Sequence, residues 1–118
     1  MLDKKLKKYW QQADGYLNGS QPSRALPLYR KVVGLDGTVH QAHYGIAACC
    51  VRLANPKFIE EAVHHITQAL LLSPTVQYLD CAVLVFIAKG LPDVALHYQQ
   101  GSSRQGRTYL SFLIHTKN

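Results

Sequence analysis

The 118-residue sequence has no long apolar run, only three cysteines and only seven acidic residues. Its most apolar stretch, residues 81–88, is far shorter than the roughly 20 residues that span a bilayer. We therefore expect no integral membrane segment. The first residues are rich in lysine and are followed by no apolar stretch, so we expect no signal peptide either.

The few cysteines argue against a disulfide scaffold. Cys49, Cys50 and Cys81 form no Cys-x-x-Cys pair, and their number is odd. All three lie in apolar surroundings, which is typical of buried, reduced thiols. The sequence therefore predicts a reducing compartment, the cytoplasm.

The shortage of acidic residues leaves a formal net charge of +6. Part of the excess is local, because four lysines crowd the N-terminal region: Lys4, Lys5, Lys7 and Lys8. Such a run is typical of a solvated face, and an acidic partner is the alternative interpretation. We do not expect nucleic-acid binding, since the lysines do not alternate with exposed aromatics and the middle of the chain is not basic.

No pattern indicates catalysis. Of the six histidines, His64 and His65 are adjacent and would point about 100° apart on a helix. No cysteine or carboxylate spacing completes a zinc site. Residues 101–106 are rich in glycine and serine but lack the Gly-Lys-Ser/Thr ending of a phosphate loop. We expect no catalytic residue, no metal and no cofactor, and hence no enzyme.

What is present is a globular composition, 47% apolar and 17% charged, in a chain long enough for one domain over residues 1–118. Turn signals at 17–20, 55–56, 73–74 and 89–92 separate segments with an apolar period near 3.6 residues. They predict an all-α fold with helices at about 3–18, 22–34, 39–53, 57–72, 75–89, 92–101 and 104–116. Pro27 falls inside the second helix, which must start later or be kinked.

Three segments of the chain are similar to one another. Tyr9, Ala13 and Tyr16 recur 34 residues later as His43, Ala47 and Cys50, and again as Tyr78, Ala82 and Val85. In the helix that follows each, the matching pairs are Ala25 with Tyr29, Ala62 with Ile66, and Val94 with Tyr98. The second segment has about three extra residues in its turn, at 55–57. Small residues at this spacing let two antiparallel helices approach closely.

This pattern resembles the tetratricopeptide repeat, with its small residue in the first helix and Ala-x-x-x-aromatic in the second. The resemblance implies three tandem helix-turn-helix repeats at about 6–39, 40–74 and 75–106. It also implies a C-terminal capping helix at 107–118 and a right-handed solenoid.

In that family the first helix of each repeat lines a concave groove. By resemblance the groove residues are Lys7, Trp10, Asp14, Leu17, Asn18, Gln41, Tyr44, Ala48, Val51, Arg52, Val76, Leu79, Val83, Phe86 and Ile87. The ninth positions of the repeats lack the asparagine of a carboxylate clamp, so we expect an apolar and aromatic groove with one polar end. Val83 and Ile87 fit a place in the core equally well.

The residues that we expect to contact a partner are Trp10, Leu17, Tyr44, Val51, Leu79 and Phe86, with electrostatic contacts from Lys4, Lys7, Lys8 and Arg52. Size, repeat number, basic charge and an apolar groove together resemble the small bacterial type III secretion chaperones. The resemblance implies a cytoplasmic chaperone that shelters a hydrophobic or amphipathic segment of a needle or translocator subunit, with a co-chaperone or a second copy covering leftover apolar surface. The alternative is a structural adaptor that holds a complex together through an acidic partner or a membrane surface.

Overall fold

The computed structural model describes residues 2–103. In this part of the chain all regular secondary structure is helical, and short connections join the helices. Their bounds are α1 Leu2–Asn18, α2 Pro22–Leu35, α3 His40–Leu53, the 3-10 helix η1 Pro56–Phe58, α4 Ile59–Leu72, α5 Val76–Lys89 and α6 Pro92–Ser103. The predicted all-α class is confirmed for these residues, and the six predicted helices within them agree to within two residues at each end. The predicted helix at 104–116 lies outside the described residues.

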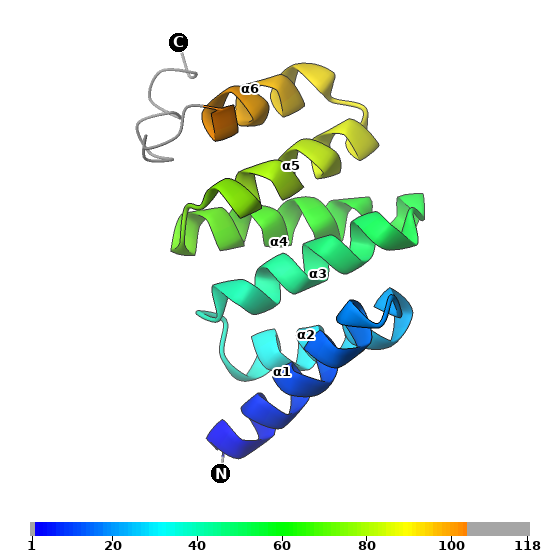
Figure 1. The fold of residues 1–118 in the computed structure, drawn as a ribbon, viewed down its shortest axis with the longest axis vertical. Helices are drawn as coiled ribbons and strands as arrows, with labels where there is room; N and C mark the ends of the chain where they lie inside the picture. Colours follow the sequence, from blue (N-terminus) through cyan, green and yellow to red (C-terminus); the bar gives the residue numbers. More distant parts are fainter. Residues whose placement is uncertain (1, 104–118) are drawn as a thin grey trace.

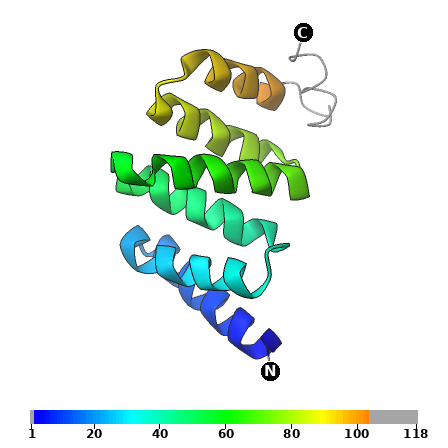
Figure 2. The ribbon, with the colours of Figure 1, turned by 180° about the vertical axis from the view of Figure 1, so that it is seen from behind.

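The helices stack in chain order along the 45 Å length of the molecule, from α1 at one end to α6 at the other (Figure 1). Each helix packs against the next, and α3 also contacts both α1 and α5. α1, α3 and α5 therefore lie on one side, whereas α2 and α4 lie on the other, as the view from behind shows (Figure 2). None of the described helices is both long and apolar enough to cross a membrane.

Small side chains let the helices approach closely. The fully buried alanines are Ala13, Ala25, Ala42, Ala47, Ala62, Ala69 and Ala82. The closest approach is at Gly45 of α3, where a Cβ atom would lie only 2.7 Å from the ring of Tyr29 in α2. Tyr29 is itself buried, and its hydroxyl donates to Asp14 Oδ1 of α1 at 2.5 Å. One aromatic side chain thus ties together the first three helices.

Helix ends follow from local chemistry. α5 begins where the Thr75 hydroxyl accepts a hydrogen bond from the backbone N–H of Tyr78, and it ends at Gly90, whose φ of 84° is the left-handed conformation that glycine tolerates. α2 begins at Pro22, so the later start considered for Pro27 is wrong. Pro27 lacks the N–H that would bond the carbonyl of Ser23, and both residues are exposed, so water can satisfy that carbonyl.

Candidate partner-binding groove

A groove runs along the side of the molecule that α1, α3 and α5 form. Its central hollow, of about 470 Å³, is lined by Trp10, Asp14, Leu17, Asn18, Tyr29, Gln41, Tyr44, Arg52, Gln77 and Tyr78. A hollow of about 360 Å³ adjoins it along α1 and shares Trp10 and Asp14. A hollow of about 250 Å³ between α3 and α5 shares Tyr44, Arg52 and Gln77. Because the hollows share lining residues, we treat them as one groove.

Hydrogen bonds between helices hold the centre of the groove in place. The Tyr44 ring of α3 stacks on the Tyr78 ring of α5 with centroids 5.0 Å apart. Gln77 Nε2 donates to the Tyr44 hydroxyl at 3.3 Å, and His40 Nδ1 lies 2.7 Å from the Tyr78 hydroxyl. These contacts give the aromatic side chains fixed positions, which lowers the entropy cost of binding to them.

Three charged side chains of the groove, Asp14, Asp80 and Arg52, form hydrogen bonds with neutral partners. The carboxylates of Asp14 and Asp80 accept hydrogen bonds from the hydroxyls of Tyr29 and Ser102, each at 2.5 Å. Arg52 donates through Nη1 to the backbone carbonyl of Leu17 at 3.1 Å, which orients the guanidinium but leaves its charge unneutralised. Burial, and next the hydrogen bond with Asp14, raise the pKa of Tyr29, so its hydroxyl remains a donor. The groove therefore offers a partner negative charge at Asp14 and Asp80 and positive charge at Lys7 and Arg52.

The groove changes from polar to apolar along its length. The polar part is at α1 and the first half of α3, where Asp14, Asn18 and Gln41 line it. The part between α3 and α5 is lined by Ala48, Val51, Cys81 and Leu84, besides Asp80 and the shared polar residues. Leu84 is 54% exposed there. This gradient agrees with the expectation of a groove with one polar end.

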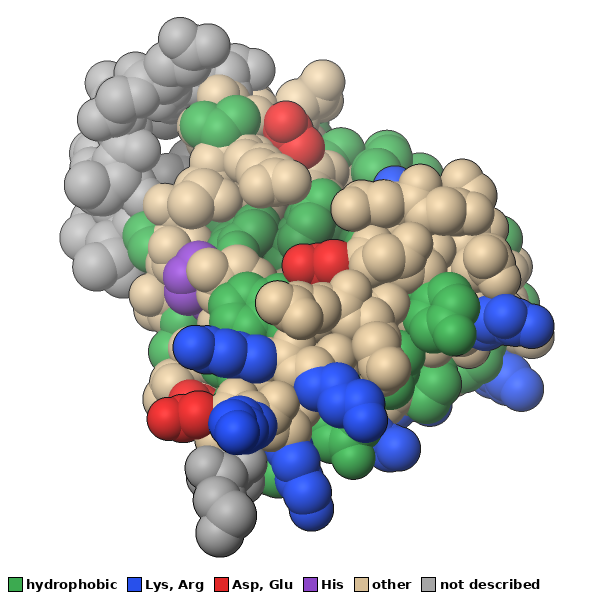
Figure 3. Space-filling view, turned by 60° about the horizontal axis from the view of Figure 1, so that its bottom comes forward, with side chains coloured by type: hydrophobic (Ala, Val, Ile, Leu, Met, Phe, Trp, Pro, Cys, Tyr) green, Lys and Arg blue, Asp and Glu red, His purple; other side chains and the backbone are tan. Residues whose placement is uncertain are grey.

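Of the residues expected to contact a partner, Trp10, Tyr44 and Val51 line the groove and are partly exposed. Leu17 lines it but belongs to the buried core. Lys7 lines the hollow beside α1 and Arg52 lies in the centre. Lysine and arginine side chains gather over the N-terminal end of the molecule (Figure 3). Lys4 and Lys8 of α1 are exposed to solvent.

The expected contacts on α5 need correction. Leu79 and Phe86 are only 5% and 8% exposed, and the Phe86 ring stacks on Tyr98 of α6 with centroids 5.2 Å apart. They hold α5 in the core instead of lining the groove. α5 presents Gln77, Asp80 and Leu84 to the groove, each one position after the predicted Val76, Leu79 and Val83.

A shift of one residue turns a helix face by about 100°, and the run at 81–88 is too uniformly apolar to reveal that rotation. The signal that sequence reasoning missed is the polar pair Gln77 and Asp80, three residues apart. Val83 and Ile87, for which the sequence allowed either a groove or a core position, differ in exposure. Val83 is partly buried, whereas Ile87 is 58% exposed.

A histidine pair lies between α3 and α4. His43 is buried, and its Nδ1 lies 2.8 Å from Nδ1 of His65. His43 Nε2 lies 2.8 Å from the carbonyl oxygen of Gly37 and must donate to it, since a carbonyl only accepts. His43 Nδ1 is therefore the acceptor and His65 the donor. Among residues 2–103, no group of three or more potential ligands could hold a metal ion.

The three cysteines are free and buried, as expected. Burial raises the pKa of Cys49 to about 12, of Cys50 to about 11 and of Cys81 to about 12. All three are therefore protonated thiols near neutral pH, and a protonated thiol is a poor nucleophile.

Comparison with known proteins finds no matching family model, no similar curated protein and no similar solved structure. What the chain does is therefore inferred from its own groove. The resemblance to tetratricopeptide repeats stays a prediction from the sequence pattern.

Proposed function

We propose that the chain is a module of three tetratricopeptide-like repeats that binds an amphipathic segment of a client protein in the groove. The observation that carries this proposal is the gradient from polar to apolar along the groove, whose polar part carries charges of both signs. An amphipathic helix or strand has one polar and one apolar surface, which match the polar and apolar parts of the groove. An acidic residue of the client would face Lys7 or Arg52, and its apolar residues would face Val51 and Leu84.

The packing of the helices supports the repeat assignment. α1 with α2, α3 with α4 and α5 with α6 would be the three pairs, and the first helix of each pair would line the groove, as in that family. The contacts of α3 with α1 and α5 are those expected when successive pairs stack side by side. Solenoid geometry and the capping helix at 107–118 stay predictions.

Trp10 and Tyr44 are the proposed anchors of the complex. Both are aromatic, partly exposed and held by neighbouring helices, and such residues carry a large share of interface energy. Each Å² of apolar surface that the client buries contributes about 25 cal/mol. Apolar side chains of the client that would otherwise drive self-association would be covered by the groove.

We propose a chaperone role, and exposed apolar side chains outside the groove support it. Leu71, Leu72, Leu91 and Leu96 are large apolar side chains that are substantially exposed. In a chaperone, a second copy or a co-chaperone would cover some of these side chains. The client of such a cytoplasmic chaperone would be an aggregation-prone subunit, such as a needle or translocator subunit of a type III secretion system.

One observation favours the adaptor alternative. Among residues 2–103 the ion pairs are Arg30 with Glu61 and Lys89 with Glu60, so the lysines at positions 4, 5, 7 and 8 take part in none. Exposed cations of this kind attract acidic proteins or anionic lipids over about 10 Å at 0.1 M salt. An adaptor that works through several of these lysines would bind in a strongly salt-sensitive way. Binding in the groove would be less sensitive to salt, because apolar burial adds to a single charge contact.

Site-specific photocrosslinking tests the proposed function. A photoreactive amino acid placed at Gln77, in the groove, is expected to crosslink to one defined segment of one protein in the native cytoplasm. The matched control is Ser23, which is exposed on α2, on the other side of the molecule. The segment should be amphipathic. Equal crosslinking from both positions, or crosslinking from Ser23 alone, would mean that the groove is not the binding surface.

A further inference from the structure

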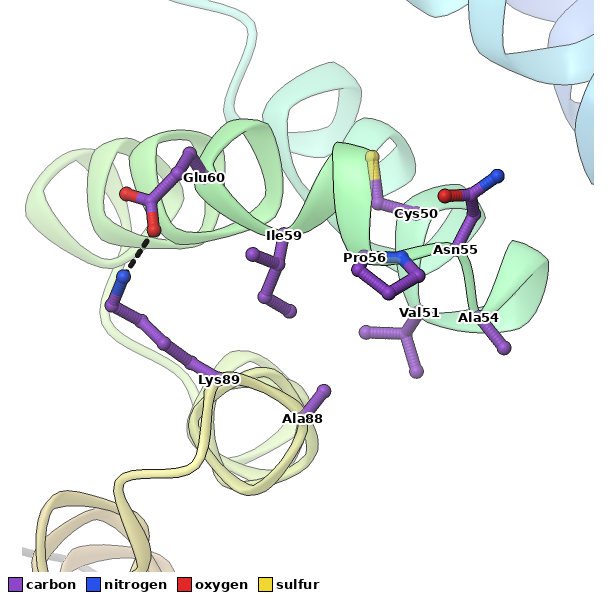
Figure 4. A pocket seen from close by; sticks show the side chains of 9 residues that line it. All are labelled: Cys50, Val51, Ala54, Asn55, Pro56, Ile59, Glu60, Ala88 and Lys89. Carbon is purple, nitrogen blue, oxygen red and sulfur yellow. Dashed lines mark hydrogen bonds and ion pairs between the residues drawn. The ribbon is translucent and has the colours of Figure 1, made fainter.

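Beyond the groove lies a further hollow of about 470 Å³, between the α3–α4 connection and the C-terminal end of α5 (Figure 4). We call it the apolar hollow, and it is lined by Cys50, Val51, Ala54, Asn55, Pro56, Ile59, Glu60, Ala88 and Lys89. Its volume falls in the range of about 300–1,000 Å³ that is usual for ligand sites.

The apolar hollow has a cause in the sequence. The connection between α3 and α4, residues 54–58, is longer than those at 19–21 and 90–91. Ala54 ends α3 in the left-handed conformation, with φ of 53°, and the Asn55 side chain accepts a hydrogen bond from the backbone N–H of Lys57 to start η1. The additional residues of this connection, with Ile59 after them, form one wall of the hollow (Figure 4).

Small and apolar side chains line the hollow. Ala54 and Ala88 leave space that larger residues would fill, and Val51, Pro56 and Ile59 surround that space (Figure 4). The two charged residues at the rim, Glu60 and Lys89, form an ion pair with each other. An occupant therefore meets no unpaired charge in the hollow and gains most from apolar contact.

Val51 connects the apolar hollow with the groove, because it lines both. The sequence of surfaces is then polar at Lys7 and Asp14, mixed at Tyr44, and apolar beyond Val51. We propose that the hollow receives a bulky apolar side chain, aromatic or branched, from one end of the client segment that occupies the groove. This inference rests on the proposed function and adds a direction to it: the polar end of the segment lies toward α1 and its apolar anchor lies toward the α3–α4 connection.

Methyl NMR spectroscopy with indole as the probe tests the hollow itself. Titration with indole is expected to shift the methyl signals of Val51, Ile59 and Ala88. Ala88→Leu, which fills the hollow, should weaken indole binding about tenfold or more. Gln12→Leu, which adds the same side chain to an exposed position of α1, should leave it unchanged. Absence of these shifts, or equal shifts in Ala88→Leu, would overturn the proposal.

The client segment found by crosslinking at Gln77 separates this inference from the proposed function. Ala88→Leu should weaken binding of the synthetic segment about tenfold, and Gln12→Leu should not. If Ala88→Leu binds the segment like the wild type while Trp10→Ala binds it poorly, the hollow does not receive a side chain of the client, although the groove still binds the client. If neither change weakens binding, both proposals fall. Circular dichroism of each variant checks that the helices are retained.

Discussion

Gly45→Ala is expected to lower the free energy of unfolding by about 1–3 kcal/mol, the usual cost of overpacking a core. The new Cβ atom would lie 2.7 Å from Cε1 and Cζ of Tyr29. The ring has little freedom to move away, because Tyr29 is buried and its hydroxyl is bonded to Asp14 on the far side. In an ordinary helix interior the same change stabilises by up to about 1 kcal/mol, so the sign of the effect is diagnostic.

Gly15→Ala is the matched control. Gly15 lies in α1, and a Cβ atom added to it would have no neighbouring atom within 4 Å, so alanine there should stabilise the helix by up to about 1 kcal/mol. Urea denaturation followed by circular dichroism measures both variants. If Gly45→Ala is as stable as Gly15→Ala, then α2 and α3 do not approach each other through Tyr29, and the packing of the first three helices is wrong.

Acid is expected to weaken the contact between α3 and α4. Burial, and then the neighbouring His43 and His64, lower the pKa of His65 from 6.5 to about 4. The folded chain therefore binds fewer protons than the unfolded chain between these values. The stabilisation is fully present above pH 6.5 and is lost as the pH falls toward 4. Because His65 is only half-buried, solvent screening reduces its contribution to about 1–2 kcal/mol.

Burial is the main reason why a charge on His65 is disfavoured. The hydrogen bond to His43 is not lost on protonation, because His65 already donates through Nδ1 and the added proton enters at Nε2. The charged groups nearby oppose one another, since Glu61 favours the charged form of His65 and Arg30 disfavours it. Arg30 also lowers the pKa of Glu61 through their hydrogen bonds, so that ion pair is lost only at a lower pH.

His65→Gln tests the acid effect, because glutamine can still donate to His43 but does not titrate. The free energy of unfolding, measured in urea at about pH 7.5, 6 and 4.5, should fall less steeply in this variant than in the wild type. His97→Gln changes an exposed histidine of α6, away from the pair, and should keep the wild-type slope. An unchanged slope in His65→Gln would show that the pair does not couple stability to pH.

The helices could be predicted closely because each is bounded by residues that punctuate the backbone. Pro22, Thr75 and Gly90 all stand at helix ends in the structure, and alanines recur where helices meet. The polar part of the groove could be predicted through the resemblance to the repeat family, which placed Trp10 and Tyr44 on its lining, where the structure has them. Their contact with a partner stays a prediction.

The rotation of α5 about its own axis could not be predicted, because most faces of that helix carry apolar residues. Several rotations would therefore bury a similar apolar surface. Packing against α6 decides it, through the stacking of Phe86 on Tyr98. The apolar hollow could not be predicted either. The extra residues at 55–57 are visible in the sequence, but whether they fill space or enclose it depends on how the connection folds against α5.

Calorimetric titration of the crosslinked client segment into the protein tests the central claim most directly. Trp10→Ala and Tyr44→Ala should each weaken its affinity by about tenfold or more, which corresponds to about 1.4 kcal/mol. Gln12→Ala, on the exposed surface of α1, should bind like the wild type. Unchanged affinity in both aromatic variants, with their helices retained, would contradict binding in the groove.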